Sequence, residues 1–295
     1  MNLLLKSALL YLLLIFASGT AKTQIIADPL TPSGIPMLED AGVFAGVGGN
    51  IQNGAFYSNC PCDFIDGRGL SFVAGFLYEK ELFPKFRYGA DALYRSDKLN
   101  SSYIEIEPVT VVSAISGKRE TVKASSRHTG DLALSSIALQ PFIKFYPFQP
   151  LYFKLAFSVS IPVSSNIIHT QELLKKTTLL STGEIGNIYF TNEDGSINNA
   201  SIITLQDEKY PELNGIYLGL IPTIGIDFRL SKKMNLSPSF QFYIPIGNIS
   251  DYSAPPSYPG SVDYKGFSIT SWYFRIEFRH TLLSDEYLKH IPEEN

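Results

Sequence analysis

Cysteine, methionine, tryptophan and charged residues are all scarce in this chain. Its 295 residues include 2 Cys, 3 Met and 1 Trp, and charged residues make up 18%. Two thiols are too few for a structural zinc site, and no His lies near them in the sequence. The net charge of −4 gives no support for nucleic-acid binding. The composition therefore argues against zinc-finger and nucleic-acid-binding proteins.

Long hydrophobic runs are also absent beyond residue 21. A membrane helix needs roughly 20 consecutive apolar residues, so the rest of the chain cannot cross a bilayer as helices. If it crosses at all, it must form a closed β-barrel, because nothing else satisfies the backbone donors in lipid. Aromatic residues, by contrast, are abundant, with 17 Tyr and 20 Phe.

The N-terminus has the features of a secretory signal. Lys6 supplies a positive start, residues 8–17 are uncharged and mostly aliphatic, and Ala17, Gly19 and Ala21 are candidate cleavage positions. No Cys follows this core, which argues against a lipoprotein anchor. The competing interpretation, an uncleaved membrane anchor, is disfavoured because the apolar stretch is short for a hydrocarbon core of about 30 Å.

Period-two alternation between turn signals predicts eight β-strands. They cover residues 41–50, 69–79, 86–96, 132–146, 151–161, 215–230, 235–246 and 264–279. Several are long enough for a tilted transmembrane strand of about nine to eleven residues. The sequence therefore predicts an all-β fold.

The two faces of these strands differ in residue size. Bulky aliphatic and aromatic residues share one face, and the other face is rich in Gly, Ala and Ser, for example Gly46, Gly75, Ala156, Gly219 and Gly225. Small residues suit a narrow barrel interior, whereas the surface of a soluble protein should be dense in Lys and Glu. We therefore expect the apolar face to contact lipid, and not the core of a soluble lipocalin-like barrel.

The predicted connections alternate between short and long. Short turns lie near residue 84 and at 147–150 and 231–234, and long stretches cover 51–68, 97–131, 162–214 and 247–263. This alternation is typical of outer-membrane barrels, which have short periplasmic turns and long extracellular loops. The prediction is a closed antiparallel eight-stranded transmembrane β-barrel with both termini in the periplasm.

Charged residues recur on the small-residue face. They are Glu79, Arg87, Asp91, Arg95, Lys144, Lys154, Asp227, Arg229, Arg275, Glu277 and Arg279. Ionised groups in a narrow interior must pair or hold water. We expect an internal charge network that plugs the barrel, and the alternative is a gated ion path. Aromatic residues on the apolar face near the short turns suggest an interfacial girdle: Tyr78, Phe86, Phe145, Phe153, Phe228 and Phe278.

The strand and turn pattern over residues 41–279 resembles the small eight-stranded outer-membrane β-barrels of the OmpA/OmpX type, in particular the outer-membrane β-barrel domain proteins of Bacteroidota and related phyla. The alternating residues Trp272, Phe274, Ile276 and Phe278 resemble the C-terminal assembly signal of such proteins. The resemblance implies contact with the barrel-assembly machinery during insertion. The chain departs from the family pattern in continuing through a polar tail.

The resulting organisation has four parts. Residues 1–21 are the signal peptide, 22–40 a periplasmic segment, 41–280 the barrel, and 281–295 a periplasmic tail. Within the outer loops, residues 103–112 and 120–126 are expected to prolong two strands as a hairpin, or to add a strand pair that makes ten. Residues 170–180 suggest a short helix, and 185–191 with 200–205 suggest a second hairpin.

Candidates for chemistry are few. His128 lies close in sequence to Ser125, Ser126 and Asp131, but proximity in sequence is not triad geometry and no catalytic motif supports it. We therefore predict no enzymatic activity and no cofactor. Cys60 and Cys62 flank one proline, so a strained loop disulfide, pairing with another molecule and free thiols all stay open.

These expectations converge on a cleaved, secreted, integral outer-membrane protein of a Gram-negative bacterium. Its partners would be outer-membrane lipid and an extracellular molecule bound through residues 97–131 and 162–214, without nucleic acid. A structural or surface-interaction role is favoured. The alternatives are a narrow porin for ions or small solutes and an outer-membrane lipid-modifying enzyme.

Overall fold

The computed structural model describes residues 38–58, 62–113, 115–192, 194, 196–211, 213–251 and 266–282. The strands all belong to one compact unit, Glu39–Leu282. The predicted signal peptide and all but the first two residues of the predicted C-terminal tail lie outside the described residues. No helix in the described part of the chain is long and apolar enough to cross a membrane.

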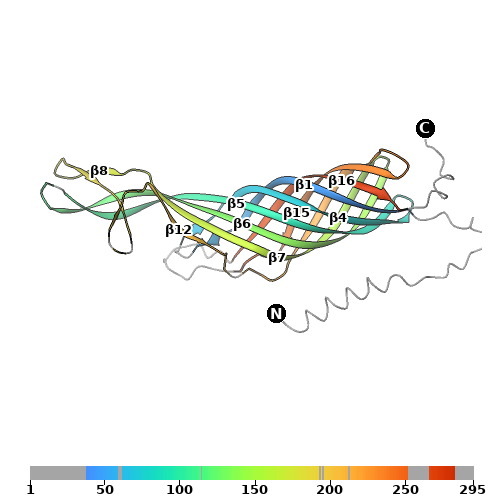
Figure 1. Ribbon diagram of the computed structural model, residues 1–295, viewed down its shortest axis with the longest axis horizontal. Coiled ribbons are helices and arrows are strands. Elements are labelled where there is room, and N and C mark those ends of the chain that lie inside the picture. Colours follow the sequence, from blue (N-terminus) through green and yellow to red (C-terminus); the bar gives the residue numbers. More distant parts are fainter. Residues whose placement is uncertain are drawn as a thin grey trace, which may run out of the picture. The chain divides into compact units, whose positions relative to one another are not determined.

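The long strands form an antiparallel sheet that closes into a ring of eight (Figure 1). Around the ring they follow the order β7 (Leu151–Leu173), β13 (Tyr217–Ile226), β15 (Met234–Ile246), β16 (Phe267–Thr281), β1 (Glu39–Gly54), β4 (Arg68–Phe83), β5 (Phe86–Val112) and β6 (Arg119–Phe148). The pairing of β6 with β7 closes the ring. The first and last strands of the chain are also paired, from Asp40 with Thr281 to Gly54 with Phe267. Every ring strand thus has a partner on both sides.

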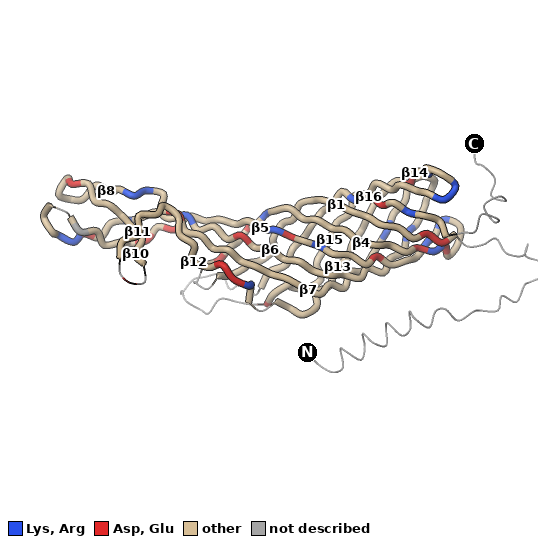
Figure 2. Tube along the Cα trace, viewed as in Figure 1, with Lys and Arg blue, Asp and Glu red and all other residues tan. Residues whose placement is uncertain are grey.

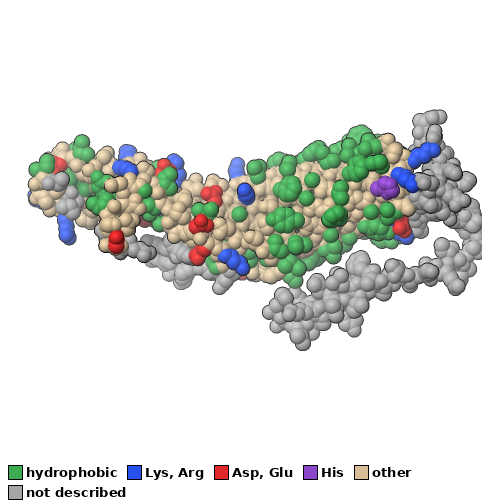
Figure 3. Space-filling view, viewed as in Figure 1, with side chains coloured by type: hydrophobic (Ala, Val, Ile, Leu, Met, Phe, Trp, Pro, Cys, Tyr) green, Lys and Arg blue, Asp and Glu red, His purple; other side chains and the backbone are tan. Residues whose placement is uncertain are grey.

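Each of the eight predicted segments overlaps one strand of this ring, and the alternation of faces is confirmed. Along β16 burial alternates strictly from Ser271 to Thr281, with Trp272, Phe274 and Ile276 exposed and their neighbours buried. Strand β13 repeats the pattern, which ends in β14 (Phe228–Arg229), the short strand that continues β13 along β15 and is exposed at both residues. Figure 3 shows hydrophobic side chains gathered over the ring strands on the face in view. A belt of large apolar side chains therefore faces away from the ring.

Three strands run far beyond their predicted ends. Strands β5 and β6 pair continuously from Phe86 with Phe145 to Val112 with Arg119, and β7 follows β6 as far as Leu173. The predicted prolongation of two strands into a hairpin is confirmed, and residues 97–131 are a strand hairpin, not a loop. The outward face becomes polar at residues such as Lys98 and Asn100, and this interrupts the apolar alternation in the sequence. The backbone pairing of the strands continues beyond these residues.

The predicted helix at 170–180 is wrong, as is the hairpin predicted from 185–191 and 200–205. Strand β7 continues to Leu173 and β8 (Thr177–Leu179) follows, paired with β9 (Ile185–Asn187). Strand β12 (Ile202–Glu208) pairs with β7, and the short strands β10 (Phe190–Thr191) and β11 (Ile197–Asn198) pair with each other. Two leucines of this segment, Leu173 and Leu180, are buried against the β5–β6 hairpin in a cluster with Val111, Ala124 and Ile188. Pairing with a neighbouring strand satisfies the backbone groups that a helix would have satisfied internally.

A short hairpin lies between β1 and β4. Strands β2 (Phe56–Tyr57) and β3 (Asp63–Phe64) pair with each other, and the rings of Phe56 and Phe64 stack with centroids 5.1 Å apart. Phe56 also contacts Phe267 of β16, at 6.0 Å between ring centroids. All three residues belong to the main hydrophobic cluster inside the ring. This segment, expected as an open loop, is packed against the ring strands.

Candidate functional site

A network of charged side chains fills the interior of the ring near the short turns. The structure places most of the predicted charge set on the inward face of the ring, all buried except the partly exposed Arg87 and Asp227: Glu79, Arg87, Asp91, Arg95, Lys144, Lys154, Asp227, Arg275, Glu277 and Arg279. Arg229 is the exception, and its assignment to the interior is wrong. It is exposed, and its Nε donates to the backbone oxygen of Ser231, because β14 ends there and the chain turns.

The group nearest the short turns is built around Glu79 and Arg279. Arg279 bonds to Glu79 through Nη1 and approaches Asp227 at 2.5 Å through Nη2. Arg87 Nη1 lies 2.7 Å from Glu79 Oε1, and Lys144 Nζ lies 3.5 Å from Glu79 Oε2. These residues come from β4, β5, β6, β16 and the β13–β14 junction. The contacts therefore cross the ring, because β16 is a neighbour of neither β4 nor β6.

A second group lies in the middle of the interior. Asp91 of β5 accepts from Lys154 of β7 and from Arg275 of β16, both at 2.7 Å. Arg275 Nη2 also lies 2.9 Å from Glu277 Oε1. None of these three strands neighbours another in the ring. Their ion pairs consequently span the interior from wall to wall.

The third group, further from the short turns, pairs Arg95 with Asp97. Arg95 Nε lies 2.6 Å from Asp97 Oδ2, Arg95 Nη2 donates to Ser271 at 2.9 Å, and the guanidinium lies over the Tyr243 ring at 3.9 Å. The three groups contain five acidic and six basic residues, and Asp40, which pairs with Arg87, brings the two kinds to equal numbers. The interior is thus electrically balanced.

Large aromatic residues share this interior, which the sequence had suggested to be lined by small residues. Lys154 Nζ lies 3.8 Å from the Phe142 ring centroid and Lys144 Nζ 3.8 Å from that of Tyr152. The glycines make room for these rings. A Cβ at Gly225, which pairs with Tyr152 across the strands, would lie 2.4 Å from the Tyr152 ring. On the inner face, aromatic side chains thus lie beside glycines, which leave room for them.

Two members of the charge network were not predicted from the sequence. Asp40 pairs with Arg87 at 2.7 Å, and Asp97 pairs with Arg95. Each lies one residue beyond the end of a predicted strand. Extending the period-two pattern by one residue at each end would have assigned both to the inward face.

The residues of the predicted assembly signal, Trp272, Phe274, Ile276 and Phe278, lie on the outward face of β16 with 38–48% of their surface exposed. The predicted girdle residues are also exposed and outward: Tyr78, Phe86, Phe145, Phe153, Phe228 and Phe278. Outward exposure of so many large apolar groups is foreign to a soluble surface.

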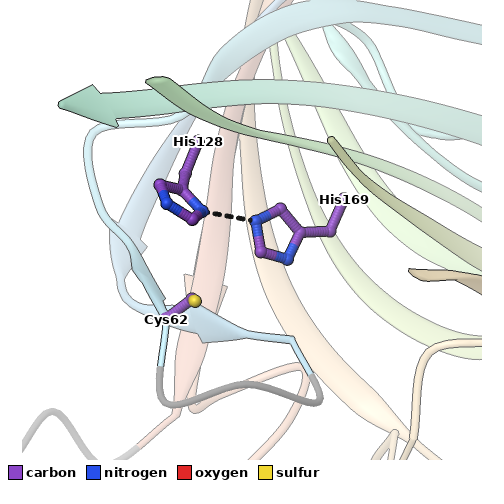
Figure 4. A group of neighbouring side chains, drawn as sticks. All are labelled: Cys62, His128 and His169. Atoms are coloured by element: carbon purple, nitrogen blue, oxygen red, sulfur yellow. Dashed lines mark hydrogen bonds between the residues drawn. The ribbon is translucent and has the colours of Figure 1, made fainter. Parts of the chain in front are cut away.

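At the end of the ring away from the short turns, a second cluster centres on two histidines. His128 of β6 and His169 of β7 are both buried, and His128 Nδ1 lies 3.0 Å from His169 Nε2 (Figure 4). Cys62, beside β3, approaches this pair: one ligand atom from each of the three residues lies within 4.8 Å of the others. The three residues are far apart in the sequence, and strand pairing brings them together.

Each histidine has a second polar contact. Ser58 Oγ lies 3.1 Å from His169 Nδ1. Ser126 Oγ lies 3.3 Å from His128 Nε2, and Glu105 Oε2 lies 3.6 Å from the same nitrogen. Burial lowers the pKa of His128, and burial followed by the neighbouring His128 lowers the pKa of His169 to about 4. Both rings are therefore neutral at pH 7.

The Ser and Asp residues near His128 in the sequence do not form a catalytic triad with it in the structure. Asp131 faces outward and accepts a hydrogen bond from Asn100 at 2.6 Å, and the ring nitrogen that a triad carboxylate would orient meets His169 instead. Cys62 is disulfide-bonded. Its neighbour Cys60 lies outside the described residues.

No family model and no curated protein matches the sequence. Solved structures similar to the chain include the attachment invasion locus protein Ail of Yersinia pestis, with 9% identity, a TM-score of 0.29, and coverage of 81% of this chain and 97% of that one. Neisserial surface protein A has 10% identity, a TM-score of 0.33 and coverage of 82% and 97%. The outer membrane protease OmpT from Escherichia coli has 8% identity, a TM-score of 0.31 and coverage of 85% and 100%.

The architecture rests on the chain's own geometry. Strand pairing closes a ring, large apolar side chains cover its outside, and ion pairs cross its inside. A water-soluble protein would place these two faces the other way round. The chain is accordingly an all-β protein built on a ring of eight antiparallel strands, with an apolar outer face and a charged interior.

Proposed function

We propose that the chain is an integral outer-membrane protein whose ring is a closed transmembrane β-barrel with a plugged interior. The short turns, such as the one between Phe83 and Phe86, face the periplasm, and the β5–β6 hairpin extends outside the cell. Its role is structural or interactive: a stable anchor that displays outer segments to an extracellular partner.

The observation that carries this proposal is the apolar belt around a charged interior. On β4 the outward residues from Leu70 to Tyr78 are large and apolar apart from Ala74. At about 3.4 Å per residue they cover about 27 Å of strand, and a tilt of about 40° reduces this to about 20 Å across the membrane. That height is close to the apolar band of about 25 Å seen on such barrels.

The plugged interior is favoured over a pore by the reach of its ion pairs. Asp91, Lys154 and Arg275 meet from three strands that are not neighbours, and all three are at most 4% exposed. An eight-stranded barrel has an interior just filled by side chains. Conduction would require this group to separate and leave buried charges without partners, at a cost of several kcal/mol.

Planar-bilayer recording of the refolded full chain tests the plug. No reproducible unit conductance steps are expected, whereas reproducible steps would favour the narrow porin. Asp91→Asn is expected to lower stability without creating steps. Heat-modifiable gel migration, measured on the same sample, establishes that the barrel has formed.

Labelling of intact cells tests the orientation. In a cysteine-free background, Ser116→Cys at the hairpin tip should react with an impermeant maleimide on intact cells. Ser231→Cys at a short turn should react only after the outer membrane is opened. The reverse pattern would overturn the proposed orientation, and labelling of neither variant on lysed cells would argue against an exposed position for both.

A further inference from the structure

We propose that His128 Nδ1, His169 Nε2 and Cys62 Sγ form a Zn²⁺ site at the outer end of the ring, complete when Cys62 is a thiolate. The site is separate from the charge network, and neither the sequence pattern nor the outer-membrane role requires it. The zinc-binding residues come from β6, β7 and the β2–β3 hairpin, so the site joins a packed connection to the ring wall.

The distances already suit a tetrahedral ion. With Zn–N bonds of about 2.0–2.1 Å, two histidine ligands of one zinc have their nitrogens about 3.3 Å apart. The observed separation of His128 Nδ1 and His169 Nε2 is 3.0 Å, so opening by a few tenths of an ångström would admit the ion. The sulfur of Cys62 would have to lie about 3.6 Å from each nitrogen, and it already lies within 4.8 Å of one ring nitrogen of each histidine. Figure 4 shows Cys62 to one side of the histidine pair, near His128.

The second nitrogens of the two rings are held as metal ligands require. A ligating histidine donates its other N–H to a carboxylate, carbonyl or hydroxyl, which fixes the tautomer and the ring orientation. His128 Nε2 faces Glu105 and Ser126, and His169 Nδ1 faces Ser58. Aromatic rings fix the planes: Tyr103 stacks on His128 at 8°, and Phe64 meets His169 edge to face at 82°. The pair is thus preorganised around the space between its two facing nitrogens.

The state of Cys62 controls whether the site is complete. In the structure its sulfur is disulfide-bonded and can donate little to a metal. A dithiol reductant breaks the S–S bond: two electrons and two protons give two thiols, and the reductant becomes a disulfide. Cys62 then loses its proton on binding Zn²⁺. Two neutral imidazoles and one thiolate are a borderline-soft set that suits zinc, with the fourth position left to water.

A second group of possible metal-binding residues lies nearby and is an alternative position for the ion. Glu105, Glu107 and His128 have ligand atoms within 4.8 Å of one another. This group offers one nitrogen and two carboxylates, of which Glu107 is exposed. The inter-histidine site is favoured because its three residues are all buried and because Glu105 is already positioned to orient His128.

A cavity lies close to the proposed site. A cavity of about 380 Å³ is lined by Asp63, Asp66 and Arg68 on one side and by residues 100–103 on the other. Tyr103 in its wall stacks on His128, and Asp63 follows Cys62 in the chain. Two carboxylates in this wall would raise the local concentration of a divalent cation.

Metal titration of the refolded full chain in detergent tests the proposal. Cys60→Ser removes the chain's only other cysteine and so keeps Cys62 as a thiol without added reductant. This variant should bind one Zn²⁺ per chain, and with Co²⁺ as the probe it should show the near-ultraviolet charge-transfer absorption of a thiolate ligand. Wild-type protein should gain the same affinity and absorption when a phosphine reductant is added.

Matched variants locate the ligands. Adding Cys62→Ser to Cys60→Ser should weaken Zn²⁺ binding at least about 100-fold and abolish the cobalt absorption, and His169→Gln should do the same. Glu105→Gln should weaken binding about tenfold, the range expected for an orienting partner. His280→Gln, exposed on the outside of the ring, is the control and should change nothing.

Three outcomes would overturn the site. One is equal Zn²⁺ affinity with and without Cys62 in the Cys60→Ser background. Another is a greater loss from Glu107→Gln than from His169→Gln, which would place the ion at the carboxylate group. The third is no Zn²⁺ binding by reduced protein that still shows heat-modifiable migration, a result that leaves the proposed barrel untouched.

Discussion

Neutralising Glu79 should destabilise the protein far more than neutralising Glu39, a partly exposed neighbour. Glu79 is 1% exposed and is the acidic partner of Arg279, Arg87 and Lys144. Glu79→Gln keeps the side-chain volume but leaves three buried cations with fewer counter-charges. Breaking a buried ion pair costs about 3–5 kcal/mol, which lowers the folding equilibrium constant by about two to almost four orders of magnitude.

Glu39→Gln is the matched control. Glu39 lies next to the network on β1 and pairs with Lys80 at 2.6 Å, but both side chains are about one-third exposed. A pair of this kind contributes less than about 1 kcal/mol. The two substitutions are chemically identical, so the difference between them isolates the effect of burial.

Urea unfolding in lipid vesicles, followed by the fluorescence of Trp272, measures both variants. Trp272 is the chain's only tryptophan and lies on the outward face. Adding Arg279→Met to Glu79→Gln should recover part of the loss, because it removes a buried charge that has lost its strongest partner. Equal stability losses for Glu79→Gln and Glu39→Gln would refute a network that depends on burial.

Three further outcomes are expected. Burial lowers the pKa of His128, and it lowers that of His169 to about 4, so between about pH 6.5 and pH 4 the unfolded chain binds more protons than the folded one. The outer end should therefore lose stability as the pH falls through this window, seen as faster limited proteolysis that a His128→Gln/His169→Gln double variant does not show. Gly225→Ala should cost about 1–3 kcal/mol in urea unfolding because its Cβ would meet the Tyr152 ring at 2.4 Å, and Tyr152→Leu in the same chain should regain part of it. Brominated acyl chains should quench the fluorescence of Trp272, and an unquenched spectrum in such vesicles would contradict an outward face in lipid.

Local alternation was sufficient to find the ring strands. A strand's side chains change face at every residue. The sequence of one strand therefore predicts which residues share its apolar face and which share its polar face, whichever strands it pairs with. That rule placed Trp272 outside and Arg275 inside. The rule was wrong at Arg229, because the strand ends there and its side chains no longer alternate between the two faces. The predicted strands also ended one residue short of Asp40 and Asp97.

The outer hairpin was only partly predictable. Outward polar residues there interrupt the apolar alternation, and the leucines of 170–180 have a spacing compatible with a helix. The structure extends β7 because β6 and β12 offer backbone partners on its two edges. Pairing between distant segments decided the secondary structure at that point, and no local pattern carries this information.

The sequence by itself determined the strands, their faces and the charged interior, because each depends on a repeat of two residues. Only the tertiary structure decided which charges meet across the ring and that Cys62 lies beside His128 and His169. Those neighbours are set by strand register and ring closure, which join residues tens to hundreds of positions apart. The chain has no His near its cysteines in sequence, yet two approach one of them in space.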